Sequence, residues 1–210
     1  MMVVQPPEGG LRMVLQHDEA AMLNQLVTQL VQLLQSHSST ALDPDPLFAS
    51  LEVGGSDAKP EDPALARLFP DAYEGDDESG RFRQVTEQGI LNRKLQDALE
   101  VTSALGLGGD PFSEADVEVE LPSAALPAWA RTLTALRLAI AARIGLEHES
   151  DHARLEADEE TRGTVLVFDW LAAILDTVMR VQLADLDRER AEGEGSGGPG
   201  DEPGRGGEGS

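Results

Sequence analysis

The sequence of 210 residues has room for one domain, or for one domain with a tail. Its 39 Asp and Glu residues outnumber 16 Lys and Arg residues, which gives a formal net charge of −23 at pH 7. This charge repels nucleic-acid phosphates and anionic membrane surfaces, so we expect no direct nucleic-acid contact and no membrane partner. Because 40% of the residues are hydrophobic, the chain can still bury a sizeable core.

The sequence contains no cysteine. This excludes a disulfide framework, a thiolate zinc site, a cysteine nucleophile and a thiol redox switch within these residues. Residues 1–10 have neither a basic leader nor the apolar core of a signal peptide, and no later stretch reaches the roughly 18 uncharged apolar residues of a membrane span. We therefore expect a cytoplasmic protein.

The N-terminal part of the chain predicts a flexible segment, a strand and then a helix. Residues 1–10 are expected to be flexible, and LRMVL at residues 11–15 is typical of a short strand. Asp18 is a suitable N-cap for a helix over residues 19–35, where apolar residues recur on one stripe. Short helices are then predicted after two Asp-Pro pairs, Asp45-Pro46 and Asp62-Pro63.

Three longer helices are predicted further along the chain. The first begins at Thr86, after the acidic turn EGDDESG, and ends at Gly106. The second covers about residues 123–144, and Gly145 is its C-terminal cap. The last covers about residues 159–186 and is apolar on most sides, which favours the centre of a bundle or the interface of a homodimer.

Together these patterns predict a mainly α fold, a bundle of about four to six helices. The alternating VEVEL at residues 117–121 predicts a second strand, which could pair with residues 11–15 as a minor two-stranded sheet. The helical domain is expected to span residues 11–190. The acidic, glycine-rich residues 191–210 predict a disordered tail.

The most suggestive motif is His148-Glu149-Ser150-Asp151-His152, which matches H-E-x-x-H by letter. In zinc hydrolases two such histidines, one helical turn apart, bind the metal and the glutamate is the general base. Here the motif follows the helix-ending Gly145 and leads into the acidic residues 155–163. We therefore interpret it as a solvated linker or a weak adventitious cation site, expect no cofactor, and keep a metal-dependent hydrolase as an alternative.

Two charged residues lie inside apolar runs, Arg137 in ALRLAIAARIGL and Asp169 in VFDWL. A charge among core residues usually needs a partner, so we interpret them as an interhelical ion pair or as outward-facing charges. A general acid or base with a raised pKa is the alternative for Asp169. Trp170, like the other aromatic residues, lies beside helical apolar positions and is expected to belong to the core.

Arg93 and Lys94 are adjacent basic residues in an otherwise acidic chain. They could dock an acidic partner or a phosphate, or form a solvated helix face on which Lys94 pairs locally with Asp97. The sequence has no glycine-rich nucleotide-binding motif and no catalytic signature, so we expect no enzymatic activity.

Several segments resemble the actinobacterial AosR-type family of oxidative stress regulators, formerly known only as a domain of unknown function. The resemblance starts with DPALARLFPDAYEGDDESGRFRQVTEQGILNRKLQDAL at residues 62–99, where the motif PDAY precedes Arg93 and Lys94. It continues in LTALRLAIAARIGL at residues 133–146 and VFDWLAAILDTVM at residues 167–179. It would cover about residues 11–186.

This resemblance implies a cytoplasmic regulator that acts by protein–protein interaction, with a sigma factor as the partner class. An adaptor or structural dimer linked to Clp proteolysis is the alternative that it implies. Redox sensing in the family is attributed to a cysteine pair. Because this sequence contains no cysteine, it cannot carry that thiol switch.

Overall fold

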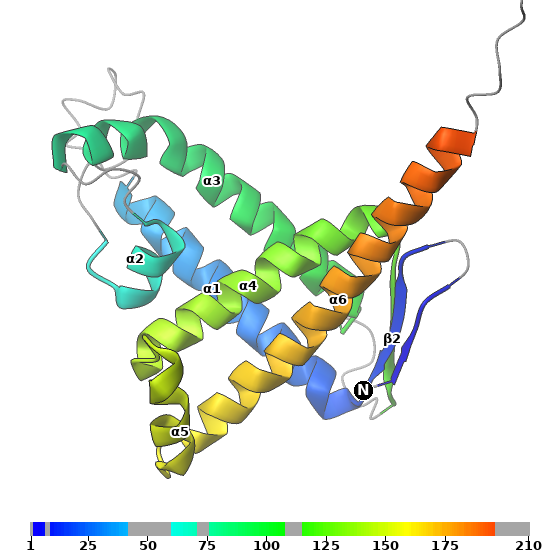
Figure 1. Cartoon of the computed structure of the whole chain (residues 1–210). Coiled ribbons are helices and arrows are strands. Elements are labelled where there is room, and N and C mark those ends of the chain that lie inside the picture. The colour runs from blue at the N-terminus through cyan, green and yellow to red at the C-terminus, as the bar shows by residue number, and fades with distance from the viewer. Residues whose placement is uncertain (1, 7–8, 42–59, 71–75, 108–114, 196–210) are drawn as a thin grey trace, which may run out of the picture.

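The computed structural model describes residues 2–6, 9–41, 60–70, 76–107 and 115–195. Within these ranges it contains six α-helices and one three-stranded antiparallel sheet (Figure 1), which confirms the predicted mainly α fold. In chain order the elements are β1 (Met2–Val4), β2 (Leu11–Leu15), α1 (His17–Ala41), α2 (Pro63–Leu68), α3 (Asp76–Leu105), β3 (Val117–Leu121), the 3-10 turn η1 (Ser123–Ala125), α4 (Leu126–Ile144), α5 (Glu149–Ala157) and α6 (Arg162–Gly195).

The sheet has the order β1-β2-β3, and the predicted pairing of residues 11–15 with 117–121 is confirmed. Leu11 faces Leu121 and Met13 faces Val119, so the buried side chains of both strands lie on one face. Strand β1, which pairs with the other edge of β2, is an addition to the two predicted strands. It lies in the segment expected to be flexible, and its three side chains are exposed.

Helix α4 is the central helix, because it contacts α1, α2, α3 and α6. In Figure 1 it crosses α6, while α5 joins their neighbouring ends. The fully buried side chains along α4 include Trp129 and Leu133, and they pack into one cluster with Leu23 of α1, Leu91 of α3 and Ile174 of α6. The bundle centre is therefore α4 rather than the last helix, which keeps part of its apolar surface exposed.

Two predicted helix ends are confirmed. The Asp62 carboxylate accepts hydrogen bonds from the Ala64 and Leu65 amides at 2.8 and 3.1 Å, so it caps the start of α2, which ends before Pro70. Gly145 adopts the left-handed conformation, with φ of 70°, at the C-terminus of α4. The helix predicted after Asp45-Pro46 and the tail beyond residue 195 lie outside the described residues.

Several predicted boundaries are wrong. Helix α1 covers His17–Ala41, so Asp18 lies inside the helix rather than at its N-cap, and the helix continues past residue 35. Helix α3 begins at Asp76 rather than Thr86. The acidic residues here were interpreted as a turn, but acidic residues are equally favourable in the first turn of a helix. The supposed linker contains helix α5, Glu149–Ala157. The last helix, predicted over about residues 159–186, begins at Arg162 and continues to Gly195. No helix among the described residues is long and apolar enough to cross a membrane.

A buried carboxylate connects the sheet to the helices. Asp185 of α6 is only 5% exposed and accepts hydrogen bonds from the Gly10 amide at 2.8 Å, the Ser123 hydroxyl at 2.5 Å and Arg188 at 2.9 Å. Burial alone would raise the pKa of Asp185, but these hydrogen bonds outweigh it and hold the pKa below the usual value. The charged carboxylate of α6 therefore meets η1 and the residue directly before β2 at one point.

Gly10 can donate this hydrogen bond because it has no side chain. Its φ is 79°, and an added Cβ would lie 2.3 Å from the Leu121 carbonyl oxygen. We expect Gly10→Ala to lower the free energy of unfolding by at least about 2 kcal/mol in urea titrations. Gly163→Ala, in open space on α6, is the control and should raise it by about 0.5 kcal/mol. Equal effects of the two substitutions would contradict this account.

Asp185 also predicts a pH dependence of stability. Because the folded-state pKa is lowered, the carboxylate stabilises the fold above about pH 4 and this contribution is lost as the pH falls through the folded-state value. We expect Asp185→Asn to cost about 1–3 kcal/mol at neutral pH, and the difference from the wild type to shrink near pH 3. Denaturant unfolding at both pH values measures this. Asp176→Asn, in an exposed pair, should show little effect at either pH.

Candidate functional site

Two open pockets lie along α4 and share Thr134 and Leu138. The first, here called the α3–α4 groove, measures about 770 Å³ and is formed mainly by α3 and α4. Its lining includes Ile90, Arg93, Lys94, Asp97, Arg131, Leu138 and Met179. The second, here called the α4–α5 pocket, measures about 690 Å³. Its lining includes Arg67, Arg137, Leu146, His148, His152 and Phe168.

Arg93 and Lys94, the predicted basic pair, both line the α3–α4 groove. Arg93 is exposed, and Lys94 is half-buried with its ammonium 5.9 Å from the centre of the Phe69 ring. Burial lowers the pKa of Lys94, although the charge of Asp97 opposes the shift. The sequence thus identified Arg93 and Lys94 as a basic pair. Only the tertiary structure shows that both line this groove and that Lys94 is partly buried.

The local pairing of Lys94 with Asp97 is replaced by a pair between helices. Both Asp97 oxygens accept hydrogen bonds from Arg131 of α4, each at 2.7 Å, and the Asp97 residue is 7% exposed. The two parallel hydrogen bonds match the fork of a guanidinium to a carboxylate. Sequence reasoning missed Arg131. The only signal for this pair was that Asp97 stands next to Ala98, which belongs to the predicted apolar stripe of its helix.

Exposed apolar side chains lie in and beside the groove. Ile90, Leu138 and Met179 line it and are 40%, 37% and 49% exposed. Along α6, Leu183 and Leu186 follow Met179 at helical spacing and are 60% and 49% exposed. We call Met179, Leu183 and Leu186 the α6 stripe. An apolar stripe this exposed favours contact with another molecule.

The α4–α5 pocket contains Arg137, whose predicted ion pair with Asp169 is wrong. The Arg137 guanidinium carbon instead lies 4.2 Å from the centre of the Phe168 ring. Its Nε is buried and has no hydrogen-bond partner within the described part of the chain. Asp169 is an exposed residue and points elsewhere, so the two charges that the sequence placed in apolar runs do not meet.

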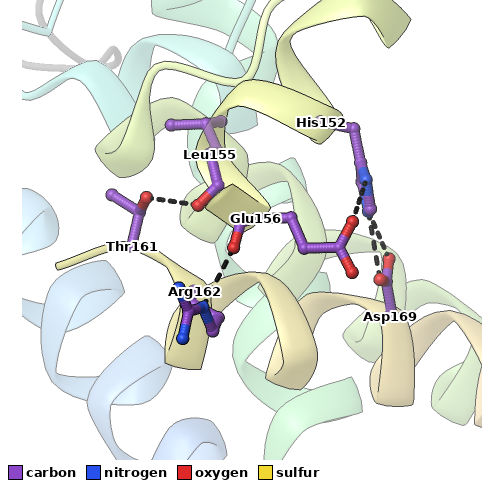
Figure 2. A network of polar contacts seen from close by, with 6 residues as sticks. All are labelled: His152, Leu155, Glu156, Thr161, Arg162 and Asp169. Carbon is purple, nitrogen blue, oxygen red and sulfur yellow. Dashed lines mark hydrogen bonds and ion pairs between the residues drawn. The ribbon is translucent and has the colours of Figure 1, made fainter. Parts of the chain in front are cut away.

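Asp169 pairs with His152 and thereby connects α6 to α5. Figure 2 shows the His152 ring between two carboxylates, with Nε2 3.0 Å from both oxygens of Asp169 and Nδ1 4.0 Å from Glu156. Beside it the Thr161 hydroxyl donates to the Leu155 carbonyl at 2.6 Å, and Arg162 donates to the Glu156 carbonyl at 3.1 Å. This network closes the turn between the two helices, so Asp169 has a structural partner.

The H-E-x-x-H letters lie at the start of helix α5, where the two histidines have separate places: His148 precedes the helix and His152 lies within it. His148 is the N-cap, and the Asp151 carboxylate accepts hydrogen bonds from the His148 and Glu147 amides at 2.9 and 3.2 Å. The His148 amide, then Arg154 and the Glu147 amide, lower the pKa of Asp151. No group of three or more metal-binding side chains occurs among the residues that the structure describes. The sequence signal for helix α5 was Asp151, an acidic residue three positions after the N-cap His148.

Trp170 packs against the hydrophobic core as a half-buried side chain. Its indole Nε1 is buried and has no hydrogen-bond partner in the described ranges, and the same is true of the fully buried Trp129. The core placement expected for both tryptophans is therefore found. Neither side chain lines one of the two pockets.

These features define a small helical protein with two open pockets along α4 and exposed apolar residues beside them. The chain belongs to the family described as Domain of unknown function (DUF2017), which it matches over residues 1–182. It is 27% identical over 188 residues to a Mycobacterium leprae (strain TN) protein that bears the provisional name oxidative stress regulator AosR. This match covers 82% of each chain. No solved structure matches significantly.

The Arg131–Asp97 pair makes a prediction about stability. Removing Arg131 leaves a carboxylate that is almost fully buried without its partner. We expect Arg131→Met to lower the free energy of unfolding by about 1–3 kcal/mol. Arg180→Met, which breaks the exposed local pair with Asp176, is the matched control and should cost at most about 0.5 kcal/mol. Urea unfolding measures both variants. Similar losses of unfolding free energy would show that the buried Arg131–Asp97 pair stabilises the fold no more than an exposed pair does.

Proposed function

We propose that this protein is a non-enzymatic regulator that acts in the cytoplasm by binding another protein. Its membership of a family with a relative named as an oxidative stress regulator supports the regulatory role. A sigma factor is the partner class, as the resemblance to AosR-type proteins implies. Because the sequence has no cysteine, the regulation does not use a thiol of these residues.

The observation that carries the proposal is the α6 stripe. Met179, Leu183 and Leu186 offer one exposed apolar line on a helix whose opposite side is packed into the core. Apolar residues supply most of the affinity at protein interfaces, and surrounding charges supply steering and specificity. A stripe of this length suits a helix or a hydrophobic groove of the partner.

The charge of the chain favours a basic partner. Exposed Asp176 and Asp187 lie near the two ends of the stripe, each in a local pair with an arginine. Around them the chain as a whole carries a net charge of −23. A sigma factor must carry basic surface to bind DNA, so an acidic regulator can approach that surface by resembling the charge of nucleic acid.

Binding to a purified sigma factor from the same cell tests the proposal. Because charge steers the encounter, we expect Kd measured by calorimetry to rise about tenfold between about 50 and 300 mM salt. Leu183→Glu should weaken binding at least about tenfold, because it places a charge in the apolar contact. Leu166→Glu is the matched control, since Leu166 is 59% exposed on the same helix but lies outside the stripe.

Two outcomes would contradict this proposal. Equal affinities of the Leu183→Glu and Leu166→Glu variants would exclude the α6 stripe as the contact. Light scattering provides the second test, because a stable homodimer that Leu183→Glu dissociates would mean that a second copy covers the stripe. That result would instead favour the structural dimer that the sequence also allowed.

A further inference from the structure

The α4–α5 pocket is open, and it has the volume and lining of a small-molecule site. Its volume of about 690 Å³ lies within the usual range for ligand pockets, roughly 300–1,000 Å³. Apolar side chains from three segments form much of its wall, among them Leu138 of α4, Leu146 after that helix and Phe168 of α6. Arg67 of α2 and Arg137 of α4 add two cationic groups. The pocket therefore combines an apolar wall with positive charge in a strongly acidic protein.

Arg137 is the cation of this pocket that has an unpaired nitrogen. Its guanidinium carbon lies 4.2 Å from the centre of the Phe168 ring, a cation–π contact that restricts its position. Its Nε is buried and has no hydrogen-bond partner within the described part of the chain, and the residue as a whole is partly buried. By contrast, Arg131 on the same helix is satisfied by two hydrogen bonds to Asp97. A partly buried, unpaired guanidinium is a preorganised fork for a carboxylate.

The remaining charges select the kind of anion. Arg67 also faces the pocket, but one of its nitrogens already donates to the Leu146 carbonyl at 3.1 Å. Exposed Glu147 and Glu149 line the pocket as well and offset the charges of the two arginines, so the net attraction offsets only part of the desolvation cost of an anion, which grows with the square of its charge. A single negative charge is therefore preferred over the double charge of a phosphate.

From these contacts we infer that the α4–α5 pocket binds a small monocarboxylic acid. The carboxylate lies on the Arg137 guanidinium, and the hydrocarbon part packs against Leu138, Leu146 and Phe168. The assignment is separate from partner binding by the α6 stripe, since it concerns other side chains. Through this pocket the protein, which contains no cysteine, would bind a small metabolite directly.

Calorimetry with the full chain tests this assignment, with hexanoate and benzoate as probes. We expect saturable binding of at least one of them, at least about tenfold tighter than acetate, because acetate lacks the apolar part. Hexylammonium and inorganic phosphate should bind more weakly than the better probe. An acetylated peptide with a free C-terminal carboxylate distinguishes a free acid from a protein terminus, and tighter binding of the peptide would overturn the free-acid assignment.

Variants locate the site. Arg137→Gln should weaken binding at least about tenfold, and Arg180→Gln, an exposed arginine of α6, should leave Kd unchanged. Should Arg137→Gln fail to fold, Ala153→Glu provides an independent test, because it adds a carboxylate to an exposed position that lines the pocket. Its control is Ala173→Glu, exposed on α6 outside the pocket. No saturable binding, equally tight phosphate binding, or binding unaffected by Ala153→Glu would overturn the inference.

Discussion

The packing of α4 is the constraint on which the rest of this structure depends. This helix contacts four other helices, so it buries apolar side chains such as Trp129 and Leu133 on several sides. Helices that pack around one central helix diverge at its ends, and the space between them must be filled or left open. Here two openings remain along α4, and Thr134 and Leu138 belong to both. The candidate sites are therefore consequences of how the bundle is assembled.

The arginines of α4 show how this packing decides chemical roles. Arg131 meets the buried Asp97 of α3 and becomes part of the scaffold. Arg137, less than two turns further along, meets an aromatic ring, and its buried Nε has no hydrogen-bond partner among the described residues. Both cations sit in an apolar helix sequence. The difference between an arginine paired within the scaffold and one that lines a pocket comes from the facing helix, because that helix supplies or lacks a carboxylate.

Short-range features of the fold were predictable from the sequence, and long-range partners were not. The Asp62 cap and the Gly145 cap depend on residues within one turn, so local chemistry predicted them correctly. Helix α5 was missed because its polar, charged residues carry almost no apolar period and a single cap-like aspartate stabilises its start. The ion pair assigned to Arg137 and Asp169 failed for a related reason. Sequence spacing does not determine which residues face each other across two helices.

The sequence by itself determined the helical class, the pairing of the two inner strands and the absence of thiol chemistry. These follow from the amino-acid composition and from the spacing of apolar residues over a few positions, which determines local secondary structure. Only the tertiary structure decided that Asp185 joins the sheet to α6, that His152 pairs with Asp169 and that Arg137 faces a pocket. Each of these contacts brings together residues far apart in the sequence or on different helices, and their geometry is set by packing rather than by local propensity.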